Sequence, residues 1–162
     1  MSANKHQPHV LVLPEDRANS EMINGFHLQV DSNKLRRLDI LREAGGWVEV
    51  LNKFLSEHVA EMDRWPFRLM VLVLDLDGHI DRLTTARNRI PEHLRDRVFI
   101  IGVLTHPEEL KQRLGVSYEA IGAALARDCR DDTSATWGHQ LLLPNAAEVH
   151  RLTQAVRPLL FT

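Results

Sequence analysis

Acidic side chains follow two apolar runs of this sequence. Glu15 comes shortly after the run His9–Leu13, and the run Arg68–Leu74 leads directly into Asp75-Leu76-Asp77-Gly78. Asp75 and Asp77 are two residues apart, so in extended backbone they point to the same side. Crowded carboxylates repel one another, and hard oxygen ligands of this kind suit Mg²⁺ or Mn²⁺. If both runs are central parallel strands, the pattern predicts a metal site.

A simpler interpretation of the same residues stays open. One Asp-x-Asp after a strand is often no more than a turn followed by a helix cap. Near the acids are side chains that suit phosphate binding, although each of them also fits a solvated surface. These candidates are Arg17, His79, Arg82 and Lys111.

Apolar periodicity predicts the elements that must position the acids. Uninterrupted β-rich runs are typical of strands buried on both faces of a parallel sheet. Expected strands are 9–13, 35–41, 68–74 and 98–104. Expected helices are 21–28 (capped by Ser20), 47–62, 80–90, 108–114, 118–129 (capped by Ser117) and 146–159. Strands that alternate with helices indicate an α/β, Rossmann-like fold, with a mostly parallel sheet of about four strands flanked by helices. Ligands of such sheets bind beyond the carboxyl ends of the strands.

Length and composition set the class of protein. The chain has 162 residues, of which 44% are hydrophobic and 26% charged, as expected for one globular domain. We expect a flexible start over 1–8 and a C-terminal helical part, 116–162, that packs on the sheet. The net charge of −2 provides no general field for nucleic acid. The single cysteine favours the cytoplasm, and the longest apolar run, 69–74, is too short to cross a membrane.

The order of these features resembles the Toprim domain of topoisomerases, primases and related nucleases. A strand followed by Glu15, a strand followed by Gly45-Gly46, and a strand followed by Asp75 and Asp77 extend the resemblance over about residues 9–109. The acidic stretch after the fourth strand is similar to the nuclease branch of that family. The chain also resembles small stand-alone Toprim-like proteins.

The resemblance implies a specific chemistry. Glu15 would be a general acid or base or a metal ligand, and Asp75 and Asp77 would hold Mg²⁺ or Mn²⁺. Glu108 or Glu109 would hold a second ion. The substrate would be a phosphodiester of DNA or RNA, and a protein partner such as an ATPase is implied, in a multi-protein defence or mobile-element system.

The chain also departs from the Toprim pattern. Pro14 stands where many Toprim domains place glycine. Tyr118, the one tyrosine, is expected in a helix, which argues against a strand-passing topoisomerase.

Two other interpretations remain. The segment 71–78 also resembles the first motif of haloacid-dehalogenase-like phosphatases, in which Asp75 would be the nucleophile and Asp77 the general acid–base. Residues 103–105 and the pair Asp131-Asp132 would supply the later motifs, although in that family the first motif opens the fold. Alternatively, the chain is a non-catalytic binding module, with Trp137–Pro144 or Leu159–Phe161 as its partner surface.

Overall fold

The sheet has four parallel strands in the order β2-β1-β3-β4. The computed structural model describes residues 2–161. The strands are β1 (His9–Pro14), β2 (Leu38–Ile40), β3 (Arg68–Asp75) and β4 (Val98–Val103). This confirms the predicted α/β class and the four-stranded, parallel, Rossmann-like sheet.

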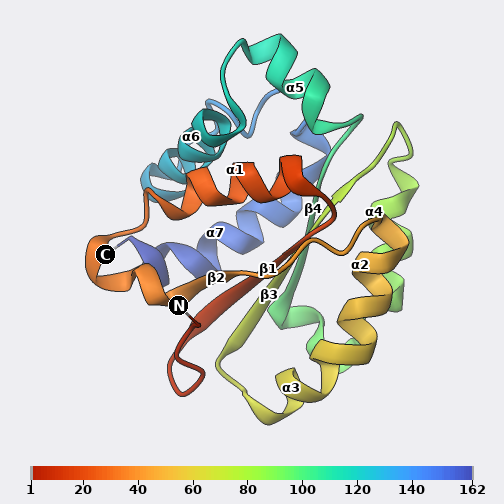
Figure 1. Cartoon of the computed structure of the whole chain (residues 1–162), viewed down its shortest axis with the longest axis vertical. Helices are drawn as coiled ribbons and strands as arrows, with labels where there is room; N and C mark the ends of the chain where they lie inside the picture. Colours follow the sequence, from red (N-terminus) through yellow and green to blue (C-terminus); the bar gives the residue numbers. More distant parts are fainter. Residues whose placement is uncertain (1, 162) are drawn as a thin grey trace.

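Helices cover both faces of this sheet (Figure 1). One face carries α1, α6 and α7, and the other carries α2, α3 and α4. The helix bounds are α1 (Arg17–His27), α2 (Trp47–Lys53), a π-helical segment (Phe54–His58), α3 (Val59–Arg64), α4 (Asp81–Arg89), α5 (Pro107–Leu114), α6 (Tyr118–Asp131) and α7 (Ala146–Leu160). Three 3₁₀ turns span Ser32–Arg37, Glu92–Arg97 and Leu143–Asn145.

Two of the predicted boundaries are wrong. Helix α1 begins at Arg17, because the Asp16 carboxylate accepts the Asn19 amide at 3.0 Å and caps the helix four residues before Ser20. The second strand is limited to Leu38–Ile40, since the preceding residues close a 3₁₀ turn. Both differences lengthen the helical connection between β1 and β2.

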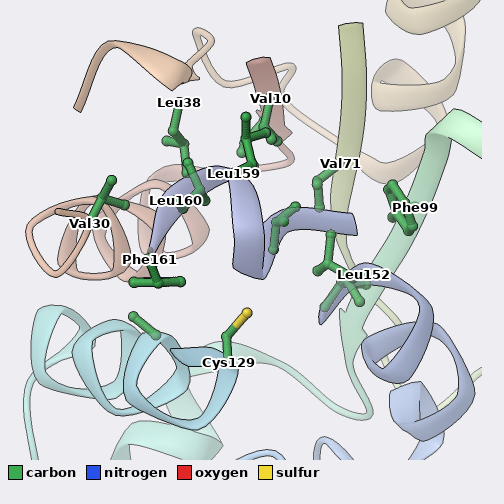
Figure 2. Packing of buried hydrophobic residues seen from close by; sticks show 14 of the residues in the cluster. Val10, Val30, Leu38, Val71, Phe99, Cys129, Leu152, Leu159, Leu160 and Phe161 are labelled. Atoms are coloured by element: carbon green, nitrogen blue, oxygen red, sulfur yellow. The ribbon is translucent and has the colours of Figure 1, made fainter. Parts of the chain in front are cut away.

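Alternate side chains of the strands enter two separate cores. Leucines of β1 and β3 pack against α2, α3 and α4, whereas valines of the same strands pack against α1, α6 and α7. Figure 2 shows the core on the side of α1, α6 and α7. There, Val10, Val71 and Phe99 of the strands face Leu152 and Leu159 of helix α7. The segment 159–161 that was a candidate partner surface is buried in this core.

Helices α1 and α6 touch along their backbones. A Cβ atom on Gly122 would lie 1.7 Å from the Met22 carbonyl oxygen, and one on Gly25 would lie 2.0 Å from the carbonyl oxygen of Glu119. Only glycine permits this approach. The contact fixes the position of α1, whose first turn borders the candidate site.

Side chains from the first turns of α7 and from Asn145, which precedes this helix, occupy the free edge of β4. Asn145 accepts the Gly102 amide at 2.9 Å and donates to the Gly102 carbonyl at 2.7 Å. Glu148 accepts the amide of Ile100 at 2.9 Å, and Arg151 donates to the first carbonyl of β4 at 2.7 Å. These residues stand three apart and match alternate positions of the strand, so they replace a fifth strand and protect the edge.

Residues near the start of the chain and the C-terminal helices both pack on the rest of the domain. Lys5 and His6 contact the ring of Trp65, with the Lys5 ammonium 4.6 Å from its centroid. The flexibility predicted for residues 1–8 stays a prediction. In the C-terminal part, α6 and α7 contribute buried residues to the core on one face of the sheet.

Candidate active site at the carboxyl ends of β1 and β3

The acids lie where the strand order of the sheet changes direction, because the two strands that follow β1 in the chain lie on opposite sides of it. Strand β2 lies on one side of β1 and β3 on the other. Such a switch point leaves a crevice at the carboxyl ends of the strands. Pro14 is aligned with Val73, and the next amide, that of Glu15, donates to the Val73 carbonyl at 2.9 Å. This register brings Glu15 beside Asp75.

Glu15 contacts the backbone of Asp75 directly. The Asp75 amide donates to Glu15 Oε2 at 2.6 Å. The side chain is half-buried, and burial raises the pKa of Glu15 above its usual range. The bond from the Asp75 amide opposes this shift, while the negative charges of Asp16 and Asp77 add to it. Glu15 is therefore a carboxyl group able to hold or release a proton nearer to neutral pH.

Asp75 is the most deeply buried of these acids, with 7% of its surface exposed. Asn19 Nδ2 donates to its carboxylate at 2.9 Å, from a fully buried position on the first turn of α1. Burial is the main cause that raises the pKa of Asp75 to about 8, and the neighbouring Asp16 and Glu15 raise it further. A charge at this position is thus unfavourable without a compensating cation.

Asp77 lies in a tight turn beyond β3. Its φ of +48° is left-handed, and Gly78 follows at +78°. The amide of Asp77 donates to the Thr105 carbonyl at 2.8 Å, so the turn rests on the end of β4. Arg82 donates to Asp77 Oδ2 at 2.8 Å and to the carbonyl of Asp75 at 2.9 Å.

The Arg82 guanidinium is held in place by an aromatic ring. It lies 4.8 Å from the centroid of Trp47, at the start of α2. Among the predicted phosphate-binding residues, Arg82 is the one tied to the acids. His79 is exposed in the same turn.

The remaining predicted residues have other partners. Arg17 is exposed and pairs with Glu21 at 3.2 Å. Lys111 is also exposed, with its ammonium 4.7 Å from the ring centroid of Tyr118. Neither is engaged by Glu15, Asp75 or Asp77.

The two glutamates of α5 also bind locally. Glu109 accepts from the Thr105 hydroxyl and from Arg113, and these two bonds lower its pKa. Glu108 pairs with His106 at 3.0 Å. Within residues 2–161, no three His, Cys, Asp or Glu side chains are arranged so that they could hold a metal ion.

Sequence reasoning missed three contributors to this site. Asn19 is buried in a helix although asparagine disfavours helix interiors, which is a usable signal. Trp47 follows Gly46, and nothing local indicates its contact with Arg82. Tyr118 is half-buried, and its pKa is raised by burial and by nearby acids that include Asp16 and Asp75. Tyr118 therefore borders the acidic edge.

Comparison with known proteins leaves the chain without a match. No family model, no curated protein and no solved structure is significantly similar to it. Within the described residues, no helix is long and apolar enough to cross a membrane.

Proposed function

We propose that this chain is a Toprim-like, Mg²⁺- or Mn²⁺-dependent nuclease that hydrolyses phosphodiester bonds of DNA or RNA. The observation that supports this proposal is the convergence of Glu15 and Asp75 from neighbouring parallel strands, with Asp77 in the next turn. Carboxylates at such an edge are the ligands that these cations prefer.

The acids supply the oxygen ligands that a divalent cation prefers, but within residues 2–161 they are not arranged to hold one, so binding would require these side chains to move. Asp75 is buried and its pKa is raised to about 8, so an adjacent cation would offset the cost of its charge. Glu15 and Asp77 would complete the set, and Asp77 must then exchange Arg82 for the ion. Glu108 and Glu109 are candidates for a second ion, after leaving their present partners. A bound cation would neutralise charge on the phosphate and favour deprotonation of the attacking water.

Side chains of the site would transfer protons and bind the phosphate. Glu15 combines a raised pKa with a half-buried position, which suits a general acid or base. Arg82, once free of Asp77, offers a guanidinium to a phosphate oxygen. Arg17, His79 and Lys111 are exposed and would contact the substrate farther from the reaction.

The phosphatase alternative is weaker in this arrangement. Its late acidic pair would be Asp131-Asp132, which ends α6, whereas Tyr118 at the other end of that helix borders the acids. A helix of 14 residues is about 20 Å long. The pair therefore lies far from Asp75, and Asp131 is already bound to Arg130 at 3.0 Å.

Part of the surface considered for the binding-module alternative is buried, although Leu143 is 54% exposed. Trp137 is half-buried, and Leu141 and Leu142 are each 2% exposed. Leu104 donates its amide to the Leu141 carbonyl at 2.7 Å, so this segment closes the core beside β4.

Because the chain has a net charge of −2, we propose that a protein partner such as an ATPase delivers the nucleic acid, in the cytoplasm.

A cleavage assay tests this function. The full chain is incubated with labelled single- and double-stranded DNA and RNA in Mg²⁺ or Mn²⁺. Glu15→Gln, Asp75→Asn and Asp77→Asn are each expected to lower cleavage by at least about a hundredfold. Asp81→Asn, an exposed acid of α4, is the matched control and should cleave like the wild type. Hydrolysis of p-nitrophenyl phosphate that survives Glu15→Gln would instead support the phosphatase, and cleavage unaffected by all three substitutions would exclude this site.

A further inference from the structure

A buried histidine and a half-buried arginine face each other at the amino ends of β1 and β3, at the end of the sheet away from the acids. His9 opens β1 and Arg68 opens β3, and the parallel register places them side by side. Only 1% of the His9 surface is exposed. Arg68 Nε lies 3.0 Å from His9 Nε2, and His9 Nδ1 lies 2.7 Å from the carbonyl oxygen of Gln7. His9 therefore has a polar partner at each ring nitrogen.

The two partners allow one protonation state of the His9 ring. Gln7 supplies a carbonyl, which only accepts, so His9 Nδ1 must carry the hydrogen. Arg68 supplies a guanidinium N–H, which only donates, so His9 Nε2 must be the bare nitrogen that accepts it. The ring is thus neutral in this arrangement, and its tautomer is fixed by its partners. A second proton can bind only at Nε2, the atom that faces Arg68.

The charged groups around this pair include a second histidine. Burial is the main cause that lowers the pKa of His9, and the positive charge of Arg68 adds to it. In the π-helical segment, the pKa of His58 is lowered mainly by burial and also by Arg68. Other charges that act on His58 are those of Lys53, Glu57 and Glu61. Glu61, on α3, is the acid that also acts on Arg68.

We propose that the His9–Arg68 pair is a pH-sensitive contact, in which uptake of a proton at His9 Nε2 displaces the Arg68 side chain from β1 and turns it towards Glu61. The added proton removes the acceptor of the Arg68 bond and places a positive ring 3.0 Å from a positive guanidinium. Glu61 offers the displaced guanidinium an opposite charge beside the bond that it accepts from Trp65 Nε1 at 3.0 Å. Acid therefore exchanges a contact between two strands for a contact between β3 and α3.

The direction of the pH response follows from the neutral state of His9. The folded protein holds the ring neutral, whereas an unperturbed imidazole is half-protonated at pH 6.5. The contribution of the pair to stability is therefore full above pH 6.5 and is lost as pH falls through the lower pKa of folded His9. The pair lies at the amino ends of the strands, so its response is independent of the proposed nuclease function.

NMR of the full chain between about pH 8 and pH 4.5 tests the proposal, with the ring nitrogens of His9 and the Nε–H group of Arg68 as probes. At the alkaline end, His9 should carry its hydrogen on Nδ1. As pH falls, the ring should titrate with a midpoint below 6.5, and the Arg68 Nε signal should shift with the same midpoint. Arg151 Nε, bonded to Glu148 at 2.8 Å, is the internal control and should not follow this titration.

Two variants separate the effect of the proton from that of packing. His9→Gln keeps an amide N–H for the Gln7 carbonyl and an oxygen for Arg68 but cannot take up the proton, so its Arg68 signal should stay constant over the whole range. Arg68→Met removes the cation, so the His9 ring should bind a proton at least about threefold more tightly. His150→Gln, at an exposed position of α7, is the matched control and should titrate like the wild type.

Three results would overturn the proposal. The first is a His9 ring with its hydrogen on Nε2 at the alkaline end, or one that stays neutral throughout the range. The second is an Arg68 signal that does not move while His9 takes up its proton. The third is an Arg68 shift that persists in folded His9→Gln, because the proton that moves Arg68 would then bind elsewhere.

Discussion

Asp75 and Asp128 are both buried aspartates, with 7% and 4% of their surfaces exposed, but their surroundings differ. Burial favours a raised pKa at Asp128, but its bonds from Trp137, Thr133 and Thr136 outweigh burial and lower the pKa. The Thr133 hydroxyl donates at 2.7 Å, and two backbone amides donate to the other oxygen. Asp128 is therefore a stable carboxylate that orders the loop after α6.

Asp75 has one side-chain donor, Asn19, and acidic neighbours. Burial and the charges of Asp16 and Glu15 raise its pKa to about 8. A protein that required only stability at this position would not need a carboxyl group there. Asp128 is stabilised by its hydrogen bonds, whereas Asp75 is a buried acid whose charge is not compensated, and this difference is why we propose a chemical role for Asp75.

Replacement of Asp75 should have the largest effect on activity. Asp75→Asn is expected to lower phosphodiester cleavage about a thousandfold, because it removes a central carboxylate. The same substitution should raise the unfolding free energy by about 1 kcal/mol at pH 8, since it removes an unfavourable buried charge. Cleavage rates and denaturant unfolding measure the two effects, and a variant that is both active and unstable would contradict the comparison.

Replacement of Asp128 should have the opposite profile. Asp128→Ala is expected to lower the unfolding free energy by about 3 kcal/mol, because one hydroxyl and two backbone amides lose a charged acceptor. Urea unfolding measures this loss. Asp131→Ala, at an exposed position of the same helix, should leave stability almost unchanged, because a surface ion pair contributes little. Equal effects at both positions would show that the loop bonds of Asp128 contribute little.

The two aspartates should also respond oppositely to pH. The pKa of Asp75 is higher in the folded state, so its contribution to stability is full below pH 3.8 and is lost as pH rises towards 8. The pKa of Asp128 is lowered on folding, so its contribution is present above pH 3.8 and is lost as pH falls below that value. Between pH 5 and 8, Asp75→Asn should reduce the decline of stability by roughly 3–4 kcal/mol. An unchanged pH profile of this variant would mean that Asp75 is already ionised at neutral pH.

Asn145 is a buried side chain without charge, and its amide group is hydrogen-bonded through both its oxygen and its nitrogen. Asn145→Ala should lower the unfolding free energy by about 2 kcal/mol, because the amide and the carbonyl of Gly102 lose their partner at the edge of β4. Cleavage by the folded fraction should stay unchanged. Asn88→Ala, at an exposed position of α4, is the control and should shift stability by about 0.5 kcal/mol or less.

The sequence predicted the parts of this structure that depend on local pattern. Unbroken apolar runs identified the buried strands, and the acids after two of them were expected to meet at one edge. Glu15 and Asp75 do meet there, joined by a 2.6 Å hydrogen bond. The start of α1 was predicted at the wrong cap, because Asp16 and Ser20 are both good capping residues and no local pattern chooses between them.

The partners of the two aspartates could not be predicted from local pattern. Asn19 reaches Asp75 because α1 packs backbone to backbone on α6 through Gly25 and Gly122. The carboxylate of Asp128 accepts from the Thr133 hydroxyl and from two backbone amides, five to nine residues away, in a turn that has no characteristic sequence. Long-range packing therefore determines the partner of Asp75, and the conformation of an irregular loop determines the partners of Asp128.

Calorimetric titration with Mn²⁺ tests the central claim most directly, on the wild type, Asp75→Asn and Asp128→Asn. Buffers of different ionisation enthalpy report whether a proton leaves the protein on binding. We expect the wild type to bind Mn²⁺ near neutral pH with release of a proton, Asp75→Asn to lose this binding, and folded Asp128→Asn to keep it. Equal Mn²⁺ affinity in the wild type and Asp75→Asn, or no binding by the wild type, would contradict the assignment of Asp75 to a metal-dependent site.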